Sequence, residues 1–163
     1  MLCGMTRYEF ALEAHSTLRL ALTACCAWLV LVALRGMLGS KDTKLSGNLT
    51  IRLAIFAADA QLILGLLLYF LWSPTTQQAR ADFGAAMKDP TLRFWAVEHG
   101  TAMVLVIACV HIGKVLVKRA GNESTRYRSM LIFFGIALAL ILLASPWPFS
   151  SIARPIWPFG HAG

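Results

Sequence analysis

Two histidines lie in one long apolar stretch of the sequence, RFWAVEHGTAMVLVIACVHIGK, where ionisable side chains are uncommon. His99 and His111 are 12 residues apart, which on a straight helix separates them by roughly 18 Å along the axis and by about 120° around it. They therefore cannot bind one metal ion together. A neutral imidazole is a common axial ligand of haem iron, so a two-ligand haem site needs a second histidine from another segment.

His15, in the segment AHSTLRL, is the candidate partner of His99. It lies just before one apolar run and His99 lies near the start of another, so two runs that cross a membrane in the same direction bring both imidazoles to one depth. Arg19 follows His15 by one helical turn on nearly the same face, and Arg93 lies at the level of His99. The two imidazoles predict the axial ligands of a haem b iron, and the arginines predict partners for its propionates.

A structural alternative accounts for the polar residues at this depth without a cofactor. Glu13 and Glu98 also lie there, among the arginines and histidines. In this alternative Glu98, Arg19 and His15 satisfy one another as a polar clamp between helices. The sequence alone leaves both interpretations open.

Asp59 and His111 lie deeper within the apolar runs. An ionisable group inside a membrane span costs a few kcal/mol or more, so such a residue is a functional hypothesis by default. The two residues come to comparable depth, and we expect them to be in contact. A proton path through Asp59, His111 and Lys114 is one use of this pair. Ligation of a chlorophyll-type pigment by His99 or His111 alone is another.

The composition predicts that helices crossing a membrane position all of these residues. The chain has 163 residues, of which 58% are hydrophobic, and its mean hydropathy is +0.65. Four apolar runs approach or reach the roughly 20 residues that a helix needs to cross a bilayer. They cover about residues 18–38, 53–72, 94–117 and 130–146. The alternation typical of membrane strands is absent from the sequence.

We expect an all-α integral membrane protein with one domain, residues 1–163. Small positions at which its helices can approach closely are Gly65, Gly100, Gly113 and Gly135.

The positive charges that give the net charge of +7 are concentrated in the connections between the apolar runs. This distribution indicates membrane topology and not binding to nucleic acid. The connections after the first and third runs carry Arg35, Lys41, Lys44, Arg52, Lys114, Lys118, Arg119, Arg126 and Arg128. By the positive-inside rule both connections are cytoplasmic and both termini lie outside. Their short length favours an up-down four-helix bundle. The tail, residues 147–163, is expected to anchor at the outer interface through Trp147, Phe149, Trp157 and Phe159.

The segments AHSTLRL, DAQLILGLLLYF, MKDPTLRFWAVEHGTAMVLVIACVHIGK and FFGIALALILLASPWPF cover most of the chain apart from the termini and the first loop. In them the sequence resembles a family of small four-helix bacterial inner-membrane proteins that carry the label "cytochrome B". The matching positions are His15, Ser16, Leu18, Arg19, Glu98, His99 and the run PWPF at 146–149. The resemblance implies the four-helix fold, the inner membrane and a b-type haem. At the position of Asp59 some relatives carry histidine, so the resemblance does not imply a ligand common to the family there.

These patterns predict a small b-type cytochrome-like protein that takes part in electron transfer near the outer face of a bacterial inner membrane. A quinone or a partner protein in a membrane redox complex is the expected exchange partner. The alternative is a non-catalytic accessory subunit of a larger respiratory or photosynthetic complex. That subunit would bind a pigment through His99 or His111, or no cofactor at all.

Overall fold

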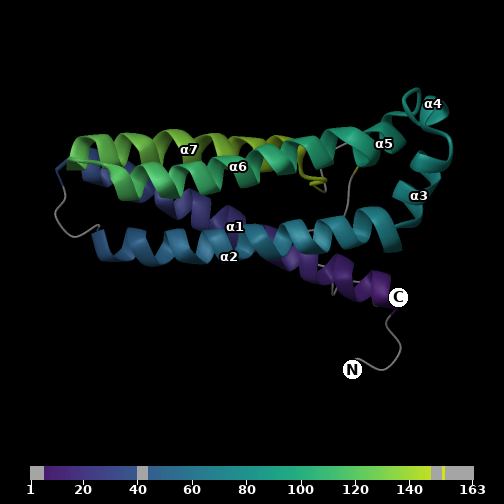
Figure 1. Cartoon of the computed structure of the whole chain (residues 1–163), viewed down its shortest axis with the longest axis horizontal. Helices are drawn as coiled ribbons and strands as arrows, with labels where there is room; N and C mark the ends of the chain where they lie inside the picture. The colour runs from purple at the N-terminus through teal and green to yellow at the C-terminus, as the bar shows by residue number, and fades with distance from the viewer. Residues whose placement is uncertain (1–5, 40–43, 148–151, 153–163) are drawn as a thin grey trace.

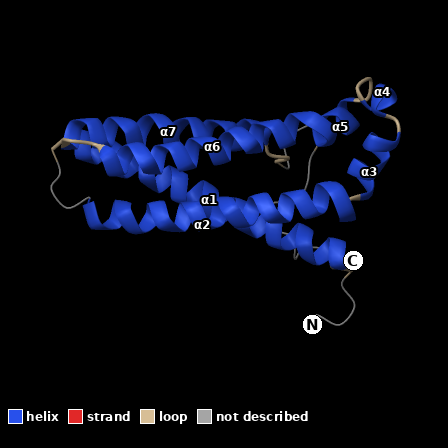
Figure 2. Ribbon diagram, viewed as in Figure 1, coloured by secondary structure: helices blue, strands red, loops and turns tan. Residues whose placement is uncertain are grey.

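The computed structural model describes residues 6–39, 44–147 and 152, and in this part of the chain every regular element is helical (Figure 2). Four helices are long and apolar enough to cross a membrane: Arg7–Met37, Asn48–Trp72, Pro90–Arg119 and Glu123–Ala144. Each predicted apolar run falls largely within one of them. The all-α class and the four long helices are therefore confirmed.

Helix α1 (Arg7–Met37) begins well before the expected residue 18. Thr6 and Glu9 form a capping box, in which Glu9 N–H donates to Thr6 Oγ1 at 3.2 Å and Thr6 N–H donates to Glu9 Oε2 at 2.7 Å. Such a box satisfies backbone donors that a helix start otherwise leaves open. His15 and Arg19 consequently lie inside α1, whereas the expected run placed His15 ahead of the helix.

The connection between the second and third long helices is itself helical. Along the chain the elements are α2 (Lys44–Leu67), η2 (Leu68–Trp72), α3 (Pro74–Ala81), α4 (Phe83–Ala86), α5 (Pro90–Arg93), η3 (Phe94–Glu98), α6 (His99–Arg119) and α7 (Glu123–Ala144). The segments η2 and η3 are single π-helical turns at facing ends of α2 and α6. Single π-turns of this kind are frequent at functional sites.

Neighbouring long helices run in opposite directions (Figure 1). The start of α6 meets the end of α7, where His99 bonds the backbone of Ala144. The first half of α1 meets the end of α2, where a Cβ placed on Gly65 would lie 3.4 Å from His15 Cε1. Helix α1 also packs along α7, and α2 packs along α6. His15 and His99 are therefore brought to the same end of the helices.

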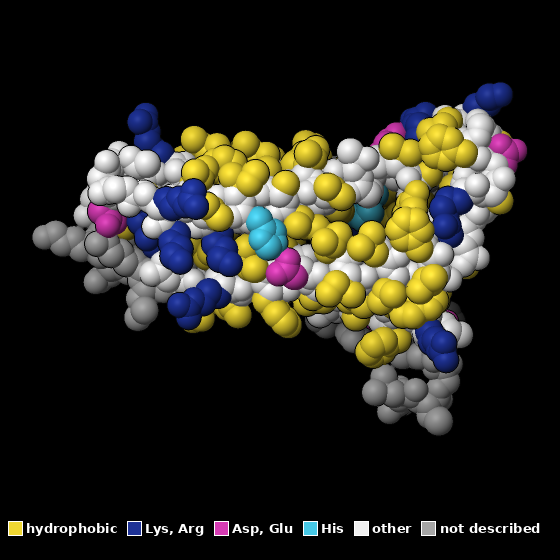
Figure 3. Space-filling model, in the orientation of Figure 1, with side chains coloured by type: hydrophobic (Ala, Val, Ile, Leu, Met, Phe, Trp, Pro, Cys, Tyr) yellow, Lys and Arg dark blue, Asp and Glu magenta, His cyan; other side chains and the backbone are white. Residues whose placement is uncertain are grey.

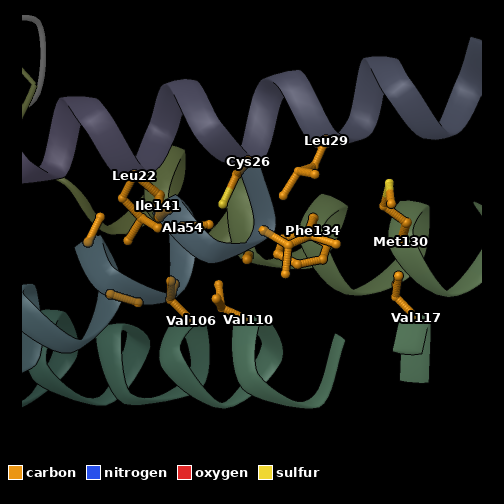
Figure 4. Close-up of a cluster of buried hydrophobic side chains, with 14 of the residues drawn as sticks. Leu22, Cys26, Leu29, Ala54, Val106, Val110, Val117, Met130, Phe134 and Ile141 are labelled. Atoms are coloured by element: carbon orange, nitrogen blue, oxygen red, sulfur yellow. The ribbon is translucent and has the colours of Figure 1, made fainter. Parts of the chain in front are cut away.

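A continuous apolar core runs between the long helices (Figure 4). Leu29 from α1, Ala54 from α2, Val110 from α6 and Phe134 from α7 are each fully buried there. Within a membrane such a core gains little from leaving water, because lipid tails are as apolar as leucine, and close packing supplies most of the attraction. The outward side chains are also hydrophobic along the middle of the molecule (Figure 3).

Two of the four expected close approaches at glycine are present. A Cβ on Gly113 would lie 2.8 Å from Phe133 Cβ, and one on Gly65 would touch His15. Around Gly100 and Gly135 nothing lies within 4 Å of the Cβ position, so neither glycine is needed for packing among the described residues. The tightest approach is at Gly36, whose missing Cβ leaves room for the ring of Tyr127.

Candidate functional site

His15 and His99 come together from α1 and α6, and their ring centroids are 6.3 Å apart with the planes inclined at 66°. Two imidazoles that ligate one metal ion, each with a bond of about 2 Å, hold their ring centroids about 6 Å apart. The observed separation therefore suits one ion between two axial imidazoles. Such an arrangement needs no third protein ligand when a macrocycle supplies the equatorial donors.

The ring of His99 is oriented by a backbone hydrogen bond. His99 Nδ1 lies 2.8 Å from the carbonyl oxygen of Ala144, the last residue of α7. A carbonyl oxygen only accepts, so Nδ1 carries the hydrogen and Nε2 keeps its lone pair. Metal-ligating histidines are commonly fixed in this way, with one ring nitrogen donating to a carbonyl and the other free for the metal.

A partly open cavity of about 670 Å³ contains both imidazoles. Leu22, Leu66 and Val106 give it apolar walls. Gly100 opens onto it, and a Cβ there would meet nothing within 4 Å. Gln61 also lines the cavity, is only 8% exposed, and has no hydrogen-bond partner for its side-chain oxygen among the described residues. The walls and this inward polar group give the cavity the character of a ligand site.

Arg19 lies in the cavity wall with a relative exposure of 7%. Its Cζ atom is 5.2 Å from the ring centroid of Trp147, which places the guanidinium over the aromatic face. Trp147 is held by a hydrogen bond from Nε1–H to the carbonyl of Leu142 at 2.8 Å. Because Pro146 has no N–H, that carbonyl lacks its usual helical donor, and the indole takes this place. Part of the PWPF run thus covers the arginine, while residues 148–151 and 153–163 of the expected tail lie outside the described residues.

Arg93 does not line the cavity. Its Nε–H donates to Glu98 Oε1 at 2.7 Å, and both side chains are about half exposed, at 45% and 49%. Glu98 is thereby engaged with Arg93 rather than with the expected Arg19 and His15. Glu13 is partly exposed on α1 and is likewise not part of the cavity wall. Of the residues expected at this level, the structure brings together His15, His99 and Arg19.

Residues of both π-helical turns line the same cavity, and the sequence alone did not predict this contribution. Tyr69 in η2 donates its hydroxyl hydrogen to the carbonyl of Ala96 in η3 at 2.9 Å. Thr76 Oγ1–H in α3 donates to the carbonyl of Tyr69 at 2.8 Å, and Arg80 donates to that of Phe70 at 2.9 Å. Helix α3 therefore satisfies carbonyls at the end of η2. In the sequence, the run SPTT could have predicted this helix start, because serine is a favoured N-cap and proline a favoured first helical residue.

Asp59 and His111 are in contact, as expected from their depth. His111 Nε2 lies 2.8 Å from Asp59 Oδ1. Both side chains are about half exposed on the outer surface of α2 and α6, at 43% for His111 and 50% for Asp59. This pair is separate from the cavity that holds His15 and His99, because neither residue lines it.

Among residues 6–39, 44–147 and 152, no group of three or more His, Cys, Asp or Glu side chains gathers as a metal site. Comparisons of the chain with family models, with curated proteins and with solved structures give no match. The functional interpretation therefore rests on the geometry of the cavity that His15 and His99 line.

Proposed function

We propose that this chain is a small b-type cytochrome-like protein of a bacterial inner membrane. In this proposal the four long helices cross the bilayer as an up-down bundle with both termini outside. One haem b lies near the outer face between His15 and His99. A quinone, or a protein of a membrane redox complex, exchanges electrons with it there.

The observation that carries the proposal is the 6.3 Å separation of the two imidazole centroids at one end of a cavity. The hydrogen bond from His99 Nδ1 to Ala144 supports it, because an Nδ1–H bonded to a carbonyl favours the ring tautomer with its lone pair on Nε2. Arg19 supports it further, since a buried guanidinium favours a carboxylate such as a propionate beside it. Bound haem supplies one-electron transfer. The protein's own residues hold the iron, fix the His99 ring, offset the propionate charge and keep water from the apolar wall.

An accessory subunit is the second candidate, and the Asp59–His111 pair is the observation that favours it. A half-exposed acid–base pair on the outer surface of membrane helices suits a protein neighbour better than lipid. In this role the subunit would bind a chlorophyll-type pigment through His99 or His111, or no cofactor. His111 is less suited to the pigment than His99, because its Nε2 already bonds with Asp59.

A visible absorption spectrum of the purified full chain tests the proposal, recorded first oxidised and then reduced with dithionite. Sharp reduced bands of a six-coordinate b-type haem are expected, with about one haem per chain by pyridine haemochrome assay. A far-red chlorophyll band would replace the proposal by the pigment-binding alternative. A colourless, folded protein after expression with ample haem would overturn both cofactor assignments and leave the polar-clamp role.

A further inference from the structure

The Asp59–His111 pair lies on the outside of the molecule, between hydrophobic side chains on one side and Lys or Arg side chains on the other (Figure 3). Three neighbouring outward side chains on α2 and α6 are hydrophobic, since Phe56 is 70% exposed, Ile63 60% and Val104 59%. Lys114, three residues after His111, is also exposed. The pair itself is about half exposed, and its recorded bond joins one nitrogen to one oxygen. Within the described part of the chain, His111 Nδ1 and Asp59 Oδ2 make no hydrogen bond. One further nitrogen and one further oxygen therefore remain available to a neighbour on this face.

Lipid is a poor cover for such groups. A charged or strongly polar side chain facing hydrocarbon costs a few kcal/mol or more, and membrane proteins usually turn such groups toward protein or water. The four described candidate spans provide no fifth helix that covers this face of α2 and α6. A neighbouring molecule with complementary polar groups at the same depth removes this cost.

We propose that this face is the interface of a parallel homodimer, in which the two Asp59–His111 pairs join. In a twofold interface residue i meets residue j and j meets i, so a surface that carries both an acid and a base is self-complementary. A twofold axis along the membrane normal keeps every residue at its own depth, and Asp59 and His111 already share one depth because they are bonded. In the proposed dimer, Nε2 keeps its bond to Asp59 within the protomer, and Nδ1–H donates to Asp59 of the partner subunit. The four side chains then form a closed, net-neutral ring.

The flanking side chains suit the same occupant. Phe56, Ile63 and Val104 provide apolar area beside the pair, and in the proposed dimer this area packs against its own copy. Another partner would have to bring a hydrogen-bond donor and an acceptor to this depth, whereas a second copy brings both by symmetry. Because α2 and α6 run in opposite directions, Ile63 and Ala108 lie on the same side of the pair at similar depth. In the dimer these two positions approach each other across the interface.

Single-molecule photobleaching of the full chain in liposomes tests the dimer. The four native cysteines are replaced by alanine, and a dye is placed on Gly121→Cys, where a side chain meets nothing within 4 Å. The parent protein should bleach in two steps at high dilution in lipid. The double variant Asp59→Leu/His111→Leu should bleach mainly in one step, with at least a tenfold weaker dimer. The matched control, Ile132→Leu/Ile136→Leu on the outer face of α7, should remain dimeric. A monomeric parent, or an unchanged dimer in the double variant, would overturn the proposal.

A cross-linking experiment covers the case in which the double variant fails to fold. Two differently tagged chains, one with Ile63→Cys and one with Ala108→Cys, are co-expressed in the same cysteine-free background. Oxidation should give the mixed disulfide dimer, while Ile136→Cys paired with Ala108→Cys should not. Absence of the first product, or equal yield of both, argues against this interface. Neither experiment depends on haem. A failure of the dimer proposal therefore leaves the haem proposal unaffected, and the reverse also holds.

Discussion

The guanidinium of Arg19 lies under the indole of Trp147, with 5.2 Å from Cζ to the ring centroid. The two residues come from opposite ends of the sequence, and the contact exists because Pro146 ends the hydrogen bonding of α7. The indole N–H then bonds the carbonyl of Leu142, which the proline leaves without a donor. An aromatic residue expected to act only as an interfacial anchor therefore also forms part of the wall around a buried charge.

Replacing Trp147 should separate its two roles. Trp147→Phe keeps an aromatic face for Arg19 but loses the hydrogen bond to Leu142, and should lower the free energy of unfolding by about 1 kcal/mol. Trp147→Leu loses both contacts, and a desolvated cation–π contact adds roughly 1–2 kcal/mol to the loss. Titration of detergent micelles with a denaturing detergent, followed by circular dichroism, measures the difference. Equal losses in the two variants would mean that the arginine gains nothing from the ring.

Gly36 is the glycine whose replacement should damage the packing most. A Cβ at this position would overlap the ring of Tyr127, which is only 5% exposed and has little room to move. We expect Gly36→Ala to cost about 1–3 kcal/mol, as over-packing usually does. Gly135→Ala, in the interior of α7, is the control without a neighbour within 4 Å, and it should stabilise by about 0.5–1 kcal/mol. Thermal unfolding in one detergent compares them. A neutral Gly36→Ala would show that α1 and α7 pack less tightly there.

Asp59 and His111 should be energetically coupled, because 2.8 Å separates their bonded atoms. Asp59→Asn should destabilise the protein in detergent, since a neutral amide is a weaker hydrogen-bond partner for the imidazole than a carboxyl group that can ionise. In a His111→Ala background most of that loss should disappear, giving a coupling energy of roughly 0.5–2 kcal/mol. A double-mutant cycle on the free energy of unfolding measures it. Additive single effects would count against a contact in the folded protein.

Depth along a helix is the part of the site that the sequence predicts well. A residue's height follows from its position at about 1.5 Å per residue, so two residues equally far from the ends of neighbouring helices must meet at one level. This reasoning paired His15 with His99 and Asp59 with His111, and the structure brings each pair together. It needs no side-chain detail, because a helix is rigid along its axis.

The ion pair between Arg93 and Glu98 could not be predicted from depth along a helix. Residues 93 and 98 are five apart, and on an α-helix they point in different directions. The π-helical turn of η3 instead brings residues five apart into line, so Arg93 and Glu98 pair. A π-turn depends on tertiary packing, and here Tyr69 donates a hydrogen bond to the carbonyl of Ala96 in η3. No residue pattern within η3 predicts this turn. The bond from His99 to Ala144 is equally hidden, since backbone carbonyls are the same for every residue.

The proposed orientation makes a simple prediction for labelling in intact cells. Gly84 lies in the connection between η2 and η3, and Gly121 lies between α6 and α7. With both termini outside, the basic connection at Gly121 is cytoplasmic and the one at Gly84 is not. In a cysteine-free background, a membrane-impermeant maleimide should label Gly84→Cys from outside, and Gly121→Cys only after lysis. Both side chains meet open space or an ordinary contact, so access alone decides the result. The reverse pattern would invert the proposed orientation.

The haem proposal predicts different outcomes for the three histidines in the long helices. His15→Ala and His99→Ala each remove one axial ligand, so each should abolish the low-spin spectrum of the reduced protein. His111→Ala should leave it nearly intact, because His111 bonds with Asp59 and does not line the cavity. His111→Ala thereby controls for the general effect of losing an imidazole from a membrane helix. Helix content by circular dichroism should stay close to that of the parent in all three variants. An unchanged spectrum in His15→Ala would exclude it as a ligand, and the interaction between the two rings would then be structural.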